Sequence, residues 1–305
     1  MTELGAPGQT ARQGRFGGVT RRRLAHAIFV YACLLALAAF ILLPLGWMLT
    51  AALKPNNVPV FTFPAEWFPT EYFNFGTFVE ALTQPREPYA RFALNSLILA
   101  TVNIVGAVLS NSLIAYPFAR LNFRGKNVLF AAVLATMLLP APVLLIPQFL
   151  LFFNIGWYGT QDGFPAGYLP LTVPAFTGNP FFIFLLRQYM RTIPKDLDEA
   201  ARIDGAGHWT IYARIILPLS MPALVVVAVF TFLGVWNDFF GPLLYLDDPQ
   251  WFTVPLALAR EVTTVGTEWN IVMAATLVAM LPPLIIYAFS QNKLMGGIAS
   301  VGIRG

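Results

Sequence analysis

Long uncharged apolar runs alternate with short polar segments along almost the whole chain. A helix needs about 20 predominantly apolar residues to cross the hydrocarbon of a bilayer, and 18 or more mark a candidate span. Six runs meet this condition, so we predict an all-α polytopic membrane protein with six transmembrane helices. The predicted spans cover residues 24–53, 92–119, 127–153, 169–186, 215–246 and 271–290.

Prolines make two of the predicted spans irregular. Pro44 lies inside the first run, where a kink is tolerated among neighbouring helices. The fourth run begins among Pro170, Pro174 and Pro180, which leaves open a re-entrant start. The first run is also too long for the apolar core of a cleavable signal, so we expect it to be a retained anchor.

Composition agrees with a membrane protein, because 57% of the residues are hydrophobic and only 11% are charged. The single cysteine, Cys33, excludes a disulfide framework and a cysteine metal site within the chain. His26 and His208 are the only histidines, and neither belongs to a His-Glu-x-x-His motif. With no pair of acids in a span either, the sequence disfavours a membrane enzyme.

Basic residues set the predicted orientation, since short cytoplasmic loops carry an excess of Lys and Arg. Fifteen of the 19 basic residues fall on one side of the six spans, and four, Lys54, Arg86, Arg91 and Arg260, fall on the other. Both termini are therefore expected in the cytoplasm, with a disordered basic tail at 1–23, a membrane domain at 24–290 and a second tail at 291–305. Topology explains the basic balance, so no nucleic-acid partner is expected.

The longest internal cytoplasmic loop, residues 187–214, carries the signals of a short helix between spans four and five. Pro194 suits a first helical turn, and Asp198 suits the positive end of a helix dipole. Ala200 and Ala201 are strong helix formers and lie on one face with Leu197, at i, i+3 and i+4. This apolar stripe of small residues would permit close approach by another surface.

A turn and a second helix are predicted to follow. Asp204 and Gly205 form a natural stop, because glycine accepts the left-handed conformation that ends a helix. The second helix would begin near Gly207 and run into span five, with a bend at Leu217 and Pro218. The alternative is a hydrophilic connector whose amphipathic part lies on lipid headgroups.

The spacing of this loop resembles the ATPase-docking loop of the inner-membrane permease subunits of ABC importers, and within them the maltose-type carbohydrate permeases. The resemblance covers nearly the whole chain. In the loop it rests on Glu199, Ala200, Ala201, Asp204, Gly205, Ile215, Leu217 and Pro218. Elsewhere it rests on Asn95–Ser96, Pro140, Arg187–Gln188, Trp236–Asn237–Asp238–Phe239, Gly296–Gly297 and Gly302–Ile303–Arg304–Gly305, where the subgroup often ends in valine-lysine-glycine.

The resemblance implies a complex in the bacterial or archaeal cytoplasmic (inner) membrane. A second permease subunit would complete the path, most simply as a heterodimer, although a homodimer stays open. Two cytoplasmic ATPase subunits would bind ATP and Mg and dock on the loop, and an external solute-binding protein would deliver a sugar-like solute. The sequence contains no Gly-x-x-x-x-Gly-Lys-Ser/Thr phosphate loop, so we expect this chain to be non-catalytic and to bind no cofactor itself.

Two questions about the path remain open from the sequence. The candidates to line it are the side chains of Asn95, Asn103, Asn111, Trp236 and Asn237. The alternative is that these groups hydrogen-bond between helices. A proton- or ion-coupled secondary transporter would need charged groups in its spans, and only Asp238 and the shallow His26 are available. The identity of the solute cannot be derived from these residues.

Overall fold

The computed structural model describes residues 21–56, 58–63, 66–69, 73–83, 88–262 and 267–302. Helices dominate this part of the chain, and its only β-structure is an isolated bridge between Gln161 and Phe164. The all-α prediction is therefore confirmed. Contacts divide the chain into two compact units, residues 1–48 and residues 49–305.

The first unit consists of the apolar helix α1 (Arg21–Ala52), whose last turn belongs to the second unit. Its segment Arg23–Ala52 is long and apolar enough to cross a membrane, and none of the most apolar window is buried within the chain. Pro44 lies inside the helix, as predicted, and Cys33 is exposed. The predicted tail was placed too far along the chain, because the helix already begins at Arg21; residues 1–20 lie outside the described part.

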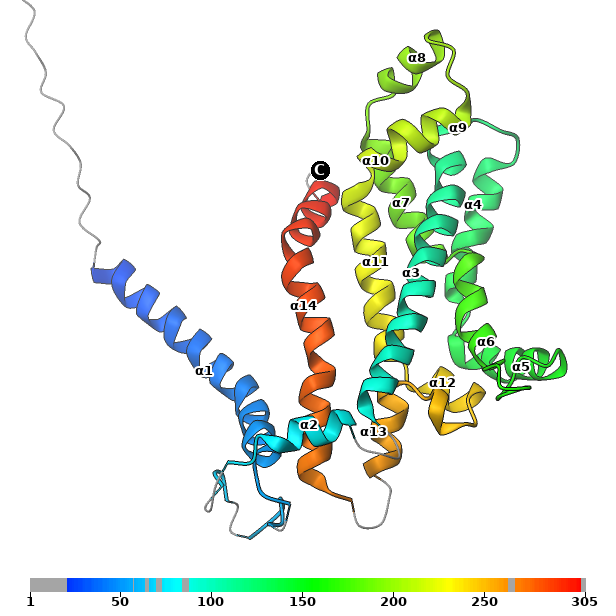
Figure 1. Cartoon of the computed structure of the whole chain (residues 1–305). Coiled ribbons are helices and arrows are strands. Elements are labelled where there is room, and N and C mark those ends of the chain that lie inside the picture. Colours follow the sequence, from blue (N-terminus) through cyan, green and yellow to red (C-terminus); the bar gives the residue numbers. More distant parts are fainter. Residues whose placement is uncertain are drawn as a thin grey trace, which may run out of the picture. The chain divides into compact units, whose positions relative to one another are not determined.

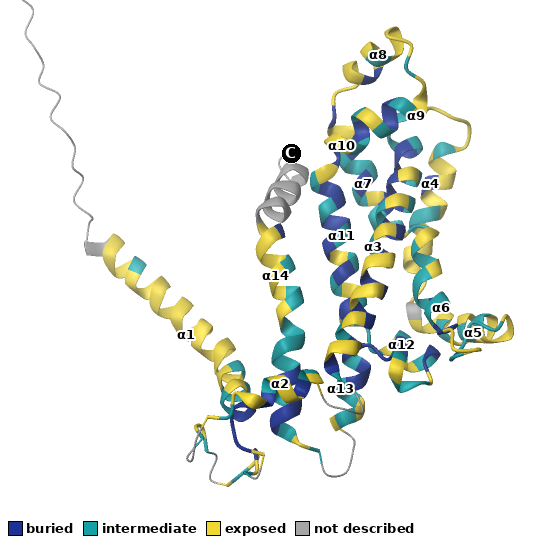
Figure 2. Ribbon diagram, viewed as in Figure 1, coloured by how far each residue is buried: buried dark blue, intermediate teal, exposed yellow. Residues whose placement is uncertain are grey.

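The second unit is organised around α3 (Tyr89–Arg120), which packs against α7 (Pro180–Thr192) and α11 (Met221–Trp236). On its other side α11 packs against α14 (Trp269–Gly302) (Figure 1). Buried residues follow α3 and α11, whereas the outward face of α4 (Lys126–Ala135) is exposed (Figure 2). These large exposed apolar faces are typical of helices that meet lipid or another apolar chain.

Four helical segments are long and apolar enough to cross a membrane and correspond to predicted spans one, two, four and six. They are Arg23–Ala52, Tyr89–Arg120, Tyr168–Thr192 and Trp269–Gln291. The fourth predicted span is built from three pieces, α6 (Tyr168–Thr172), the 3-10 turn η2 (Val173–Phe176) and α7. Prolines remove backbone donors and break the regular helix there. The predicted loop began at residue 187, but helix α7 continues to Thr192. Arg187 and Arg191 therefore belong to the helix and not to the loop.

The third predicted span is broken rather than continuous. Helix α4 and the turn η1 (Thr136–Leu138) end at Pro140, and α5 (Ala141–Asn154) leaves at 98° to them. Pro140 has an extended backbone and, lacking an N–H, cannot continue the helical ladder. Hydropathy alone joined these pieces, because both of them are apolar.

The fifth predicted span is also bent, by 74°, between the segments His208–Leu219 and Met221–Trp236. The predicted bend at Leu217 and Pro218 lies just before the observed break at Ser220. A π-helical turn, η3 (Tyr212–Ile216), precedes the short helix α10 (Leu217–Leu219), and such turns commonly accommodate a proline that cannot donate. Helix α11 ends at Trp236, and α12 (Phe240–Tyr245) is a separate short helix, so the predicted span to residue 246 is not one continuous helix.

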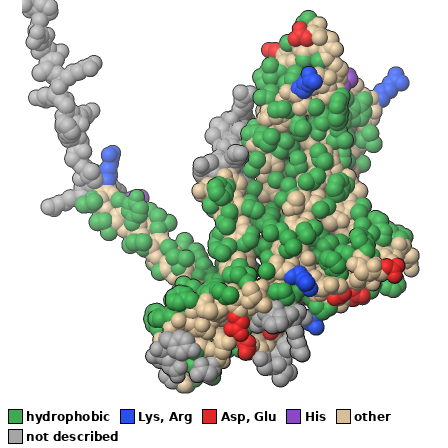
Figure 3. Space-filling view, viewed as in Figure 1, with side chains coloured by type: hydrophobic (Ala, Val, Ile, Leu, Met, Phe, Trp, Pro, Cys, Tyr) green, Lys and Arg blue, Asp and Glu red, His purple; other side chains and the backbone are tan. Residues whose placement is uncertain are grey.

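Three short elements lie at the end of this unit opposite the loop between α7 and α11 (Figure 1). They are α2 (Gly76–Thr83), the 3-10 turn η4 (Pro249–Trp251) and α13 (Val254–Val262). In residues 49–305, the charged side chains visible in Figure 3 gather towards the two ends, and hydrophobic side chains cover the length between them. Helix α14 continues to Gly302, so the predicted tail at 291–305 begins as helix, while residues 303–305 lie outside the described part.

Candidate functional site

The loop between α7 and α11 folds as two helices joined by a tight turn. Helix α8 (Asp196–Ile203) carries three acidic residues in its first turn, which suits the positive end of its dipole. Helix α9 (His208–Ile211) begins after Gly207, whose backbone is extended. The predicted helix, turn and helix are all present; Pro194 precedes α8 instead of occupying its first turn.

Gly205 forms the turn with φ of +83°, a conformation that favours glycine. The N–H of Gly205 donates to the Arg202 carbonyl at 3.0 Å, and the N–H of Ala206 donates to the Ala201 carbonyl at 2.8 Å. This pair of bonds is a Schellman motif, which satisfies carbonyls at the helix end. No heavy atom lies within 4 Å of the position that a Cβ at Gly205 would take, so this chain leaves room for a side chain there.

The outer surface of α8 is open and partly apolar. Leu197 is 41% exposed and Ile203 is 87% exposed, while Glu199 and Ala200 are also exposed. Ala201 is half-buried against the residues that pack under the loop. The predicted apolar stripe is therefore divided: the side chains of Leu197 and Ala200 are exposed, and that of Ala201 packs partly against the core. Ile203, which the sequence analysis did not single out, is the most exposed apolar side chain of α8.

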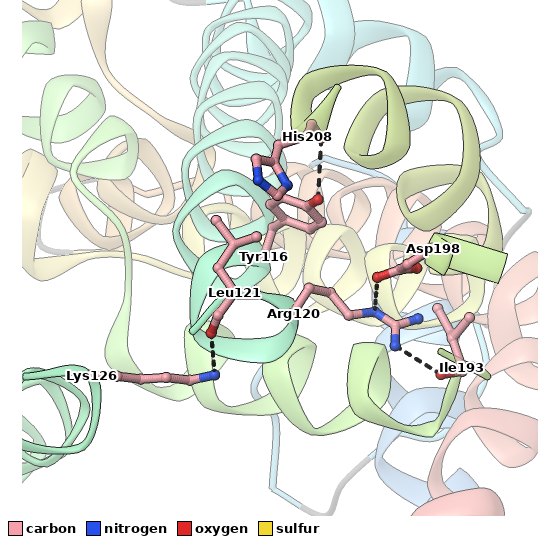
Figure 4. Close-up of polar contacts among 7 residues, drawn as sticks. All are labelled: Tyr116, Arg120, Leu121, Lys126, Ile193, Asp198 and His208. Carbon is pink, nitrogen blue, oxygen red and sulfur yellow. Dashed lines mark hydrogen bonds and ion pairs between the residues drawn. The ribbon is translucent and has the colours of Figure 1, made fainter. Parts of the chain in front are cut away.

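A buried ion pair joins α8 to the end of α3 (Figure 4). Arg120 Nε lies 3.6 Å from Asp198 Oδ2, and the two side chains are 1% and 8% exposed. Arg120 Nη1 also donates to the Ile193 carbonyl at 2.9 Å. Sequence reasoning placed Asp198 at a helix dipole and missed this partner, because nothing local in the sequence links the two residues.

Two further contacts tie the same face of α3 to the second helix of the loop. The Tyr116 hydroxyl donates to the His208 carbonyl at 3.2 Å (Figure 4). The Ser112 and Tyr212 hydroxyls lie 2.8 Å apart. Ser112, Tyr116 and Arg120 recur every four residues, which places them on one side of α3. This spacing was readable in the sequence, but what it faces was not.

The remaining predicted docking residues shape the bend at which the loop meets α11. Ile215 lies in η3, and Leu217 begins α10; both are half-buried and pack against the core under the loop. Pro218 is exposed. These three residues therefore lie in the turns that lead to the break at Ser220, and Asp204 is the C-cap of α8.

Three predicted path residues hold irregular backbone in place. The Asn95 side-chain amide donates to the Gln250 and Phe252 carbonyls at 2.9 and 3.0 Å. Asn103 donates to the Leu171 carbonyl at 2.9 Å, and the Asn111 amide oxygen accepts the N–H of Asn179 at 2.6 Å. All three asparagines are buried. These are the interhelical hydrogen bonds of the alternative interpretation, and a role in a path stays a prediction for them.

The two path candidates at the C-terminal end of α11, Trp236 and Asn237, differ in exposure. Trp236 is buried, stacks on Phe232 at 5.4 Å between ring centroids, and donates to the Ala279 carbonyl at 3.1 Å. Asn237 is the C-cap of α11 and is exposed; its amide donates to the Leu233 carbonyl at 2.8 Å. Asn237 is therefore the path candidate with the most accessible side chain.

Metal-binding chemistry finds no support in the described residues, where no group of three His, Cys, Asp or Glu side chains converges.

Comparison with known proteins gives a consistent result. Residues 111–295 match the family described as binding-protein-dependent transport system inner membrane component. The chain is 29% identical to the diacetylchitobiose uptake system permease protein of Streptomyces coelicolor, covering 91% of this chain and 89% of the relative. It is 31% identical to the arabinooligosaccharides transport system permease protein of Bacillus subtilis, covering 71% and 74%.

The fold also matches a solved structure, that of a bacterial ABC transporter involved in the import of the acidic polysaccharide alginate. The TM-score is 0.77, and the match covers 90% of this chain and 98% of the other at 20% identity. The matched family segment includes the loop, the end of α3 that holds it, and α11.

Proposed function

Because the chain belongs to the family of binding-protein-dependent transport system inner membrane components, we propose how its described residues serve an ABC importer. The exposed face of α8 docks on a separate ATPase, and α3 and α11 transmit the movement of α8 to the membrane helices. The observation that carries this proposal is the combination of an open α8 surface with a buried attachment underneath it.

The contacts between α3 and the loop favour movement of the loop and the membrane helices as one rigid body. Arg120 holds α8, Tyr116 holds the start of α9, and Ser112 meets Tyr212 beyond it. A push on α8 is therefore resisted by α3 at successive turns, and it reaches α11 through the bend at Ser220. Such packed elements move as rigid units because close-packed interiors do not deform continuously.

The proposed assembly has four kinds of partner. A pair of ABC ATPase subunits binds ATP and Mg on the cytoplasmic side, and this chain supplies no catalytic residue. A second permease subunit, as a heterodimer, completes the path, and an external solute-binding protein delivers the solute. The bilayer of the bacterial or archaeal cytoplasmic membrane surrounds the helices, with both termini in the cytoplasm. The excess of basic residues on the loop side supports this orientation.

The proposed solute class is a sugar or a sugar-like compound. The two relatives are permeases for diacetylchitobiose and for arabinooligosaccharides, and the matched structure belongs to an importer of a polysaccharide. Sugars are recognised by hydrogen bonds to hydroxyls, which an exposed amide such as Asn237 can supply. The alternative, a proton- or ion-coupled secondary transporter, gains no support from these relatives.

Substitution at Gly205 tests the docking surface. Gly205→Arg should leave the protein in the membrane but abolish solute uptake and weaken ATPase co-purification. Gly205→Ala is the matched control, because it imposes the same left-handed backbone strain, about 1–2 kcal/mol, without the bulk. Since this chain leaves space at Gly205, a loss specific to Arg requires a surface on another protein. Normal uptake by well-expressed Gly205→Arg would contradict the proposal, as would proton-driven uptake without any ATPase.

A further inference from the structure

A cavity of about 830 Å³ lies beneath α8, where α3 and α7 end and α4 begins. This volume is in the range of small-molecule binding sites. Six basic and two acidic side chains line it, so the lining carries an excess of four positive charges. They are Arg120, Lys126, Arg187, Arg191, Lys195 and Arg202, with Asp198 and Glu199.

The most buried of these cations has an unused donor. Arg120 Nε and Nη1 face Asp198 and the Ile193 carbonyl (Figure 4). Arg120 Nε and Nη2 are both buried without a hydrogen bond in the described part of the chain, as is Asp198 Oδ1; Nε has Asp198 Oδ2 at 3.6 Å as an ion-pair partner, and Nη2 takes part in neither of the two contacts. A guanidinium presents five N–H donors in a fixed fork, and leaving one buried and unpaired is costly. The cavity thus contains a donor that a bound acceptor would satisfy.

Two other basic residues of the lining are held in place by contacts that leave donors available. Arg187 Nε donates to the Phe118 carbonyl at 3.1 Å, and its guanidinium lies 4.0 Å from the centre of the Phe130 ring. Lys126 Nζ donates to the Leu121 carbonyl at 2.6 Å (Figure 4). Each of these side chains has more N–H groups than these contacts use. Contacts within the chain therefore position three of the six cations of the lining, Arg120, Lys126 and Arg187.

Arg191 and Lys195 belong to the solvent-exposed part of the lining. Both are exposed, and within the described residues no hydrogen bond or ion pair holds either side chain. Val128 also lines the cavity and is 74% exposed on the apolar outer face of α4. The opening therefore combines free cations with apolar surface, the pairing that a lipid headgroup and its acyl chains require.

We propose that this cavity binds a phosphate group, with Arg120 Nη2 as the buried donor and Arg191 and Lys195 as contacts at the opening. Several arginines suit a phosphate because each can form two parallel hydrogen bonds to its oxygens. The phosphate is that of an anionic lipid or of a free phosphorylated compound, and the apolar opening favours the lipid. This site is independent of the solute that is transported and of the protein that α8 contacts.

Binding by the purified full-length chain in detergent tests the site, at one fixed ionic strength. Isothermal titration with inorganic phosphate forms one arm, and native mass spectrometry with added phosphatidylglycerol forms the other. The variant Arg191→Gln/Lys195→Gln should weaken saturable binding at least about tenfold, because two charge-assisted contacts are lost. The control Arg124→Gln/Arg214→Gln removes the same charge from exposed positions that do not line the cavity. Its binding should be unchanged.

The two arms distinguish the source of the phosphate. Retention of phosphatidylglycerol that depends on Arg191 and Lys195 identifies a lipid site, whereas saturable phosphate binding without lipid retention identifies a free anion site. If neither probe binds, the proposal is wrong. Equal weakening of binding in both double variants would also overturn it, because that result would reflect diffuse charge. Matching thermal unfolding curves for the two variants show that a loss of binding does not come from misfolding.

Discussion

Helix α3 holds short, broken backbone segments along most of its length, but the chemistry of these contacts changes towards its last turns. In the first half and the middle, neutral amides and hydroxyls bind carbonyls of broken segments: Asn95 at the Gln250–Phe252 turn, Asn103 at Leu171, and Ser110 at Ala175, 2.9 Å away. In its last turns, Tyr116 and Arg120 hold a loop whose outer face is exposed. The first set fixes broken segments against the part of α3 before Tyr116, the stem, and the second fixes the loop helices α8 and α9 to the end of α3.

The difference follows from what each region has to satisfy. Prolines near α6 and α7 leave backbone groups without helical partners, and in a membrane these must be paired within the protein. Neutral Asn and Ser side chains hydrogen-bond to these backbone groups without placing a charge inside the stem. Helix α8 instead stands at the polar end, where an ion pair is tolerated if both partners are present. We expect the two regions to respond differently to substitution.

The largest expected loss of stability comes from breaking the buried ion pair. Asp198→Ala should lower the free energy of unfolding by about 3–5 kcal/mol, because it leaves Arg120 charged and unpaired in a buried position. Arg120→Met/Asp198→Leu should be less destabilised than Asp198→Ala, since it removes both charges. Thermal unfolding of Arg120→Met, Asp198→Leu and the double variant in detergent measures this coupling; strictly additive losses would show that the pair does not act as a unit.

An intermediate effect is expected in the stem. Asn95→Ala should cost about 1–2 kcal/mol, because the Gln250 and Phe252 carbonyls lose their donor. The KM for uptake should stay near that of the unmodified protein if Asn95 is structural. Asn237→Ala is the comparison, since its exposed amide bonds only within its own helix.

That comparison also separates the two roles assigned to polar residues of the spans. Asn237→Ala should change stability little, within about 0.5 kcal/mol, and should raise the KM for uptake if Asn237 lines the path. The opposite pattern, with a raised KM for Asn95→Ala and none for Asn237→Ala, would move the path to the first half of α3.

The smallest effect is expected from one hydroxyl at the loop end. Tyr116→Phe removes the 3.2 Å bond to the His208 carbonyl but keeps the ring packed against Tyr212, with centroids 5.3 Å apart. We expect a loss of about 0.5–1.5 kcal/mol in unfolding free energy. Tyr189→Phe is the matched control, because the Tyr189 hydroxyl makes no hydrogen bond among the described residues. Equal unfolding curves for the two variants would show that the Tyr116 bond adds nothing.

Local chemistry explains why the loop was predictable and the break in the third span was not. The helix-forming Ala200 and Ala201, the turn at Gly205 and the bend near Pro218 act on their own neighbours, so their effect can be derived from sequence. Hydropathy registers apolar residues and ignores direction, which is why the break at Pro140 was not predicted. The family resemblance was confirmed by the comparisons.

The residues that hold the loop were missed for a different reason. Arg120 counted only as a topological charge, and Asp198 only as a helix-dipole residue. Their pairing depends on α3 and α8 meeting in space, and no local pattern contains that information. The same applies to Asn95, whose acceptors lie in a distant turn. In both cases the partner could be found only from the fold, and so could the burial of Arg120 and Asp198.

The central claim, that α8 docks on an ATPase in the cytoplasm, is tested most directly at Ile203. This side chain is 87% exposed, and Cys33→Ser provides a background without other thiols. Ile203→Cys should react with a membrane-impermeant maleimide in inside-out vesicles, and added ATPase subunits should protect it. Labelling that is unaffected by the ATPase, or that occurs only from the opposite side of the membrane, would contradict the claim.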